Sequence, residues 1–484
     1  MHNTIKKIGL VLIGGLTGVM ISLNFSAVAN KATQEVMHPL PIEELRSFTQ
    51  VFGRIKSDYV EPVEDKKLIT EAINGMLVGL DPHSAYLDKD DYRELQIGTQ
   101  GEFGGLGIQV TMEDGLVKVI SPIEDTPAFR AGVKTGDLII KLDDTAVKGM
   151  TLSEAIKLMR GKPKTSLTIT IIREGEAEPL IFTLVRDIIK IQSVKSKMIE
   201  PGYAFIRVTQ FQENTGRNLA LAIKKLFEKS SIPMQGLVLD LRNDPGGLLN
   251  GAVAVSAAFL PQDALVVYTD GRTDEARMKL HANPRFYLRG DDEDFLEGLP
   301  VDIKTVPMIT LVNGGSASAS EIVAGALQDH ERSVVMGSQT FGKGSVQTIL
   351  PLGNETAIKL TTARYYTPNG NSIQAKGITP DILDEEEEAD SRRLREADLS
   401  RHLSNGEAKK TDADQSADKA KAKAKAEAKA KAKAKAKQED EDEDEKRTEP
   451  IEFGSSDDLM LARAMDYLKG VTPFPEKKVS KSDN

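Results

Sequence analysis

The stretch VNGGSASASEI, residues 312–322, joins an apolar strand that ends at Val312 to a helix that begins near Ser318. Its glycines and alanines leave room for a substrate backbone to approach. The first N–H groups of a helix have no partner within the helix and lie at its positive end, so they can stabilise a developing negative charge. Ser318 can therefore be a nucleophile, or it can be an ordinary capping residue paired with Glu321.

A second glycine-rich loop, GSQTFGKGS at residues 337–345, contains a lysine that needs an explanation. One explanation is a phosphate-binding loop, because the glycines and the lysine match most of the G-x-x-x-x-G-K pattern. Against it, Gly344 stands where that pattern needs Ser or Thr. The residues that follow are β-branched and include Pro351, so no helix is expected there. Nucleotide binding is therefore the weaker alternative.

The other explanation is a general base. A buried Lys343 amine can lose its proton near neutral pH and accept the proton of Ser318. Gln347 lies four residues further on. If residues 343–350 are extended, the two side chains share a face and Gln347 can orient the amine. We therefore favour a Ser-Lys active site.

The region that contains both loops, residues 188–383, alternates between apolar runs and amphipathic segments, which is typical of a layered α/β domain. The predicted strands are Tyr203–Val208, Gly236–Leu241, Val306–Val312, Ser333–Met336 and Thr356–Leu360. The predicted helices are Asn218–Glu228, Leu249–Phe259 and Ala319–Leu327. The polar residues between about 270 and 300 are expected to form a surface excursion.

Two regions precede this domain. Residues 38–97 repeat apolar side chains at helical spacing and are predicted to be helical. Residues 98–187 are rich in glycine and in short β-type runs, with one amphipathic helix at 152–159. The predicted strands of this region are residues 108–110, 116–120, 138–142 and 167–172. A segment of this length can fold as a small β-rich domain.

The N-terminus predicts export. Lys6 and Lys7 precede an apolar run, and Ala27-Val28-Ala29 gives a cleavage pattern, so residues 1–29 have the form of a secretory signal. The alternative is an uncleaved membrane anchor. Either one predicts a protein in the periplasm or attached to the outer face of the cytoplasmic membrane.

The C-terminal part changes composition. Residues 384–449 are a low-complexity insertion of acidic runs and an Ala-Lys repeat. Such a segment has little to bury, so it is predicted to be a solvated linker or a tether to an anionic surface. The apolar positions within residues 450–472 predict one more helix that docks back on the core.

Composition excludes several other chemistries. The 484 residues include no cysteine, so disulfides, thiolate catalysis and cysteine metal sites are ruled out. None of the six histidines stands at metal-ligand spacing, and we expect neither a metal nor a cofactor. His83, His281 and His330 are poor candidates for a Ser-His-Asp triad. The net charge of −10 resides mainly in acidic blocks and indicates no nucleic-acid surface.

In their order along the chain, these motifs resemble the carboxy-terminal processing peptidases, serine endopeptidases with a Ser-Lys active site. The resemblance covers nearly the whole chain, apart from the Ala-Lys insertion. It rests on Ser318, Lys343 and Gln347. The further stretches that carry it are LDPHS at 80–84, GLGI at 105–108, PA at 127–128, AG at 131–132, GD at 136–137, LRNDPGGL at 241–248 and GITPDI at 377–382.

The resemblance implies a PDZ domain inserted beside an α/β core of the crotonase/ClpP kind, with a helical N-terminal region. The roles that it implies are nucleophile for Ser318, general base for Lys343, orienter for Gln347, and oxyanion-hole N–H donors for Ala319 and either Gly246 or Gly247.

The PDZ-like segment suggests how substrates are chosen. Gly105, Leu106, Gly107 and Ile108 open a strand from a glycine-rich turn, whose N–H groups suit a carboxylate. The strand edge can pair with an extended peptide, so we expect binding of protein or peptide C-termini. The family also implies a homo-oligomer and leaves room for membrane attachment or a regulatory partner. A non-catalytic PDZ adaptor of exported proteins is the alternative, and the intact Ser-Lys pair argues against it.

Overall fold

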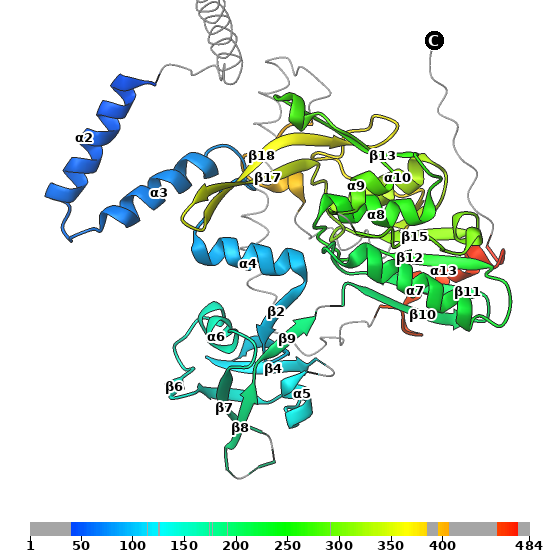
Figure 1. Ribbon diagram of the computed structural model, residues 1–484, viewed down its shortest axis with the longest axis horizontal. Helices are drawn as coiled ribbons and strands as arrows, with labels where there is room; N and C mark the ends of the chain where they lie inside the picture. The colour runs from blue at the N-terminus through cyan, green and yellow to red at the C-terminus, as the bar shows by residue number, and fades with distance from the viewer. Residues whose placement is uncertain are drawn as a thin grey trace, which may run out of the picture. The chain divides into compact units, whose positions relative to one another are not determined.

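The computed structural model describes residues 40–384, 395–405 and 453–472, except residues 114, 124, 125, 174, 177, 191 and 291. Its contacts divide the chain into two units, residues 1–72 and residues 73–484. Figure 1 shows the helices and strands with the labels used below. Among the described residues, no helix is both long enough and apolar enough to cross a membrane.

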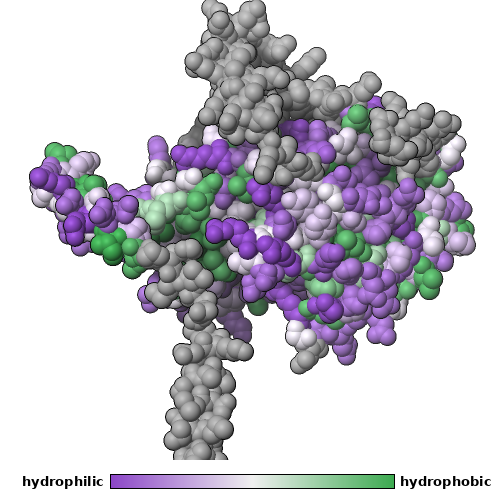
Figure 2. Space-filling model, turned by 90° about the horizontal axis from the view of Figure 1, so that it is seen from above, coloured by the Kyte–Doolittle hydropathy of each residue, from purple (hydrophilic) through white to green (hydrophobic). Residues whose placement is uncertain are grey.

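The first unit contains helix α2 (Ile42–Asp58) and the beginning of α3 (Asp65–Val78). The apolar side chains of α2 recur at helical spacing, yet none of its residues is buried. Leu45, Phe48 and Val51 are each about half exposed. Figure 2 shows hydrophobic residues at the surface of the N-terminal helices. The predicted helical N-terminal region is confirmed, and its apolar face has no partner within the described unit.

The β-rich domain is an antiparallel sheet with strand order β3-β4-β5-β7-β8, and β6 pairs with β5. The strands are β3 (Ile108–Glu113), β4 (Leu116–Pro122), β5 (Leu138–Leu142), β6 (Thr145–Ala146), β7 (Ser166–Ile172) and β8 (Leu180–Val185). The helices are α5 (Pro127–Ala131) and α6 (Leu152–Met159). Alternate strand residues such as Val117, Ile139 and Ile169 fill a separate core. A Thr151–Glu154 capping box fixes the start of α6.

The chain enters and leaves this domain through one ribbon. Strand β1 (Ala85–Leu87) and helix α4 (Lys89–Gln100) come first, and β2 (Glu102–Gly105) then leads into the domain. On the way out, β9 (Asp187–Lys190) pairs antiparallel with β2. Because entry and exit lie side by side, the domain is built as an insertion.

The α/β domain is organised around a second sheet of order β10-β11-β12-β15-β16-β19, in which all strands after β10 are parallel. The strands are β10 (Val194–Glu200), β11 (Tyr203–Val208), β12 (Gly236–Asp240), β15 (Met308–Val312), β16 (Val334–Gly337) and β19 (Ile382–Leu383). The helices are α7 (Thr215–Lys229), α8 (Leu249–Phe259), α10 (Ala319–Asp329) and α13 (Leu459–Leu468). The predicted α/β core is thereby confirmed.

Helices cover both faces of this sheet. Side chains such as Ile206 and Leu239 pack with α7, α8 and α10 in one core. Their strand neighbours Phe205 and Val238 point to the other face, where they pack with Met460 and other residues of α13. The strands are therefore apolar on both sides, as a parallel sheet between two helical layers requires (Figure 1).

A third sheet has the order β1-β18-β13-β14, with β17 beside β18. The loop that leads into β17, residues 338–344, contains Lys343 and is called the lysine loop below. The longer strands of the sheet are β13 (Leu265–Gly271), β17 (Ser345–Gly353) and β18 (Thr356–Tyr366), and β14 spans Lys279–His281. The remaining short helices are η1 (Asp274–Ala276), α9 (Pro284–Tyr287) and η2 (Val301–Lys304).

Two segments pack more closely than the sequence predicted. Within the expected surface excursion at 270–300, Leu280 and Tyr287 are buried in the main core. Residues 395–405, which lie inside the predicted low-complexity insertion, cross the lysine loop and include η3 (Glu396–Asp398). We call residues 395–405 the strap. In both places most residues are polar, so the composition of the segment does not indicate the few side chains that are buried.

Candidate active site

Ser318 lies in the turn between β15 and α10. Its φ of 56° and ψ of −111° fall outside the regions that a residue with a side chain ordinarily adopts. The residue is 8% exposed. Ala319 begins α10, so its N–H has no acceptor within the helix. The strained turn therefore holds a serine at the positive end of a helix.

Three hydrogen bonds attach this turn to the loop that follows β12. Ser316 Oγ donates to the Leu241 carbonyl at 2.8 Å. Ala317 N–H and Ser320 Oγ both donate to the Asp244 carbonyl, at 3.0 Å and 2.8 Å. The hydroxyl groups of Ser316 and Ser320 thereby fix the turn at Ser318, the nucleophile turn, onto residues 241–248, which we call the glycine loop.

The two glycines of that loop differ in what their N–H groups do. A Cβ added to Gly246 would lie 2.8 Å from Ser318 Cβ, so this glycine permits close approach to the serine. Its N–H, however, donates to Asp244 Oδ1 at 2.8 Å. The Gly247 N–H has no acceptor in the described part of the chain. Of the two candidates for the oxyanion hole, Gly247 is the one with a free donor.

Asp244 is unusual among the residues of this loop. It is completely buried, and its Oδ2 has no hydrogen-bond partner within the described residues. Burial raises the pKa of Asp244 to about 8. A carboxyl group that stays neutral at pH 7 places no negative charge beside the glycine loop, where an anion would otherwise be repelled.

Glu321 joins the two candidate catalytic loops. Its Oε2 accepts the Ser318 N–H at 2.8 Å and the Lys343 N–H at 2.9 Å. Its Oε1 accepts the Thr340 hydroxyl at 2.5 Å and the Gly342 N–H at 2.7 Å. The side chain is fully buried, and burial raises the pKa of Glu321 to about 7 despite these four donors. One carboxyl group thus sets the spacing between the serine and the lysine.

Lys343 lies two residues before β17 and is partly buried. Burial lowers the pKa of its amine, and the nearby charge of Lys359 lowers it further. The carboxylates of Glu396, Glu321 and Asp81 oppose this effect without outweighing it. The Lys343 amine makes no hydrogen bond or ion pair within the described residues. Its surroundings favour the neutral form that a general base needs.

Gln347 is bonded to neighbours other than Lys343. The register shift beside it places the extra residue, Thr362, on β18, so β17 keeps its alternation and Gln347 shares a face with Ser345. The Gln347 Nε2 donates to Ser345 Oγ at 3.0 Å and to Thr361 Oγ1 at 3.2 Å. No hydrogen bond joins it to Lys343 in the part of the chain that is described. Its Oε1 remains as an acceptor.

The histidines are engaged elsewhere. His281 and His330 each bond a backbone carbonyl oxygen, at 2.9 Å and 2.7 Å. His83 bonds the carboxylate of Glu396 at 2.8 Å. No described histidine hydrogen bonds to Ser318, so the geometry offers no imidazole base.

The β-rich domain contains a groove between β3 and α6. It is a cavity of about 260 Å³. It is lined by Phe103, Gly105, Leu106, Gly107, Ile108, Gln109, Val110, Ile156, Met159 and Arg160. All four residues predicted to bind a peptide C-terminus therefore line one groove. The groove is mostly apolar, and one arginine stands at its edge.

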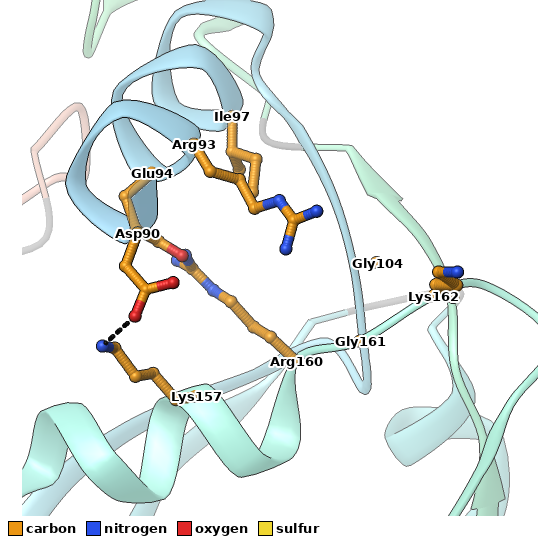
Figure 3. A pocket seen from close by; sticks show the side chains of 9 residues that line it. All are labelled: Asp90, Arg93, Glu94, Ile97, Gly104, Lys157, Arg160, Gly161 and Lys162. Atoms are coloured by element: carbon orange, nitrogen blue, oxygen red, sulfur yellow. Dashed lines mark hydrogen bonds and ion pairs between the residues drawn. The ribbon is translucent and has the colours of Figure 1, made fainter. Parts of the chain in front are cut away.

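A second cavity, of about 440 Å³, lies between α4 and α6 (Figure 3). Lys157 on α6 pairs with Asp90 on α4 at 2.9 Å, and Arg160 pairs with Glu94. Arg160 lines both cavities. The peptide groove and the contact of this domain with α4 therefore share a residue.

Comparison with protein families gives three matches. The model of peptidase family S41 matches residues 202–383, and the PDZ domain model matches residues 104–184. The model of the activating protease CtpB N-terminal domain matches residues 19–91. The matched segments follow the same order as the helical, β-rich and α/β regions.

Relatives extend the match along the chain. A carboxy-terminal-processing protease of Bartonella bacilliformis is 47% identical over 374 residues, which are 77% of this chain and 82% of that protein. The carboxy-terminal processing protease CtpA of Bacillus subtilis is 34% identical over 69% of this chain and 67% of its own. A solved photosystem II D1 C-terminal processing protease is 29% identical, with a TM-score of 0.40, over 70% of this chain and 86% of that one. The chain belongs to the carboxy-terminal processing proteases, serine-type peptidases of family S41 that carry a PDZ domain.

Proposed function

We propose that this protease is an exported endopeptidase in which Ser318 is the nucleophile and Lys343 the general base, and that its PDZ domain selects substrates by their C-terminal ends. The observation that carries the proposal is the Glu321 carboxyl group, which accepts the N–H groups of both residues. The strained Ser318 at the start of α10 and Lys343 are thereby held by the same carboxyl group. The lowered pKa of Lys343 supports its role as a base.

The first half of the reaction transfers the acyl group to the enzyme. The neutral Lys343 amine accepts the proton of Ser318 Oγ as the oxygen attacks the scissile carbonyl carbon. The Ala319 N–H and the Gly247 N–H are the donors available to the resulting oxyanion. The lysine ammonium then returns its proton to the leaving amine nitrogen, and the C–N bond breaks.

The second half releases the acyl product. Lys343 accepts a proton from water, whose oxygen attacks the ester carbon, and then returns the proton to Ser318 Oγ. The Gln347 donors are held by Ser345 and Thr361, so Oε1 is the atom that can accept from the lysine amine. The Ser318–Lys343 hydrogen bond is absent from the described residues of the free enzyme. We expect it to form when substrate closes the site.

The PDZ groove supports a preference for free C-termini. Its glycine-rich turn can bind a carboxylate, β3 offers an edge to an extended peptide, and the apolar lining suits an apolar final side chain. An Ile156→Asp substitution places a carboxylate in this groove. It should raise KM for a free-acid substrate and leave kcat for a very short peptide unchanged.

The sequence supports a location for the protein, and the exposure of α2 supports its assembly. The signal-like residues 1–29 support export to the periplasm, or attachment to the outer face of the cytoplasmic membrane. The exposed apolar face of α2 supports assembly with a second copy. Fractionation of cells and sedimentation of the purified protein test these two statements.

The decisive experiment is proteolysis of a loosely folded protein with an apolar C-terminus. Ser318→Ala and Lys343→Ala should each abolish cleavage, and the double variant should lose little more, because the two residues act as one unit. Lys376→Ala is the control lysine on a neighbouring loop and should retain activity. In the wild type, kcat/KM should rise with pH as Lys343 loses its proton. Retained cleavage by Lys343→Ala, or cleavage by Ser318→Ala, contradicts the mechanism.

A further inference from the structure

The strap places a buried carboxylate beside the lysine loop. Glu396 is completely buried. Its N–H donates to the Phe341 carbonyl at 3.1 Å, and Arg395 Nη2 donates to the Lys376 carbonyl at 2.9 Å. The first of these bonds holds the strap against the backbone of the lysine loop. Because a buried charge is costly unless it is paired, the partners of the Glu396 carboxylate are informative.

Those partners form a chain that ends at the base. His83 Nε2 lies 2.8 Å and 3.0 Å from the two Glu396 oxygens, and Gln374 Nε2 donates to Oε1 at 2.9 Å. The other end of that amide, Gln374 Oε1, accepts the Gly344 N–H at 3.1 Å. Gly344 directly follows Lys343. The carboxylate therefore fixes the backbone of the general base through one intervening side chain.

The residues beside His83 form a second chain to the same strand. Asp81 accepts the His83 N–H, the Ser84 N–H and the Ser84 hydroxyl, each at 2.8 Å. The Thr361 N–H donates to Ser84 Oγ at 3.1 Å, and Gln347 Nε2 donates to Thr361 Oγ1 at 3.2 Å. The turn at residues 81–84 thus reaches the lysine loop at one end and Gln347 at the other.

We propose that Glu396, held by His83, is a positioning residue for the general base Lys343. It fixes the loop through Gln374 and places a negative charge near the amine. The inference rests on the function proposed above and extends the site to two segments, the strap and the turn at 81–84, which lie far from Lys343 in sequence.

The charges around the amine make this role measurable. Lys359 and burial favour the neutral amine, whereas Glu396, Glu321 and Asp81 favour the ammonium. Burial alone raises the pKa of Glu396, but the bonds from His83 and Gln374 outweigh it and lower the pKa overall. Glu396 is therefore ionised near neutrality and can only accept, so His83 Nε2 carries a proton and donates. Removing the Glu396 charge must then lower the pKa of Lys343.

Glu396→Gln removes the charge and keeps the shape. The Gln oxygen can accept from Gln374, and its NH₂ can donate to His83 once the imidazole changes tautomer. The variant is therefore expected to fold. Its kcat/KM should reach half of its maximum at a lower pH than in the wild type. Glu200→Gln, which removes a surface partner of Lys469, is the control and should not shift the profile.

The histidine gives a second, independent test. His83→Ala should lower kcat by roughly tenfold or more, because the loop loses its alignment. His83→Gln, whose Nε2 can replace that of the imidazole, should recover most of the loss. His402→Ala, at the other histidine of the region, is the control and should behave as the wild type, since among the described residues its side chain bonds the Leu399 carbonyl of its own segment.

The measurements are pH profiles of kcat/KM and thermal melting of each variant. A folded Glu396→Gln enzyme with an unshifted profile overturns the inference, as does a His83→Ala enzyme with wild-type kcat. If Glu396→Gln does not fold, the comparison of His83→Ala with His83→Gln tests the inference instead. Cleavage by Ser318→Ala would instead overturn the proposed function itself, so the two failures are distinguishable.

Discussion

Glu321→Gln is a sharp test of how the two catalytic loops are joined, because it keeps the side-chain shape and removes one acceptor oxygen. In the wild type, two oxygens accept four donors, from Ser318, Lys343, Thr340 and Gly342. A Gln side chain loses least when its oxygen takes the Oε2 position. Both catalytic residues then keep their bonds, the Thr340 hydroxyl gives up its acceptor and turns to accept from the NH₂, and the Gly342 N–H is left without an acceptor.

The cost follows from that count. One buried N–H without an acceptor costs about 1–3 kcal/mol, and the opposite orientation of the amide would leave two. If the loss disorders the lysine loop, it corresponds to roughly a tenfold to hundredfold decrease in kcat/KM. Burial raises the pKa of Glu321 to about 7, so in the wild type this group contributes less stability as pH rises from about 4.5 through 7. Gln does not titrate, so the stability deficit of the variant should be largest at acid pH.

The assay is peptide cleavage and urea unfolding at pH 5 and pH 8, with Glu228→Gln on the exposed face of α7 as the matched control. We expect the control to match the wild type in both measurements. The variant should show the stated loss in kcat/KM and a deficit in unfolding free energy that shrinks between the two pH values. A Glu321→Gln enzyme with wild-type turnover and an unchanged unfolding midpoint would refute the idea that this carboxyl group joins the loops.

Three other changes test separate parts of the structure. Asp458→Ala should lower the unfolding free energy, measured in urea, by about 1–3 kcal/mol, because the buried Arg242 loses one of its two carboxylate partners and keeps Asp240; a change within error contradicts this. Gly246→Ala should reduce kcat by roughly a hundredfold, because its Cβ would meet the nucleophile turn, whereas Gly149→Ala has a similar φ, meets nothing and should stay active. Deleting residues 408–448 should leave turnover of a short peptide unchanged, whereas a deletion that also removes the strap should abolish it; equal activity of both would show that the strap is dispensable.

Much of the fold could be predicted because its signals are local. The alternation of apolar runs and helical segments between 188 and 383 gave strands and helices close to those observed. The glycine-rich turns before Ser318 and Lys343 marked the ends of strands. Strand alternation explains why both faces of the central sheet are apolar. Patterns of this kind depend on neighbours within a few residues, which the sequence displays directly.

The rest of the site depends on partners that are distant in sequence. Glu321 has the spacing of a common helix cap, and only the structure brings Gly342 and Lys343 to it. The partners of Gln347 include Thr361 on the neighbouring strand, which the sequence does not indicate. Glu396 lies among residues of low-complexity composition, so an average over that region conceals one buried carboxylate. These residues are recognised by what contacts them rather than by their own surroundings in the chain.

The position of α13 also determines the order in which the enzyme can be completed. Ribosomes make Ser318 and Lys343 before they make residues 458–468. Until those residues appear, one apolar face of the central sheet has no cover, and Arg242, at the start of the glycine loop, lacks the Asp458 carboxylate that later binds it. The nascent chain therefore carries both catalytic side chains before it can stabilise their final arrangement. Completion of the catalytic domain is thereby delayed until the last described helix has been synthesised.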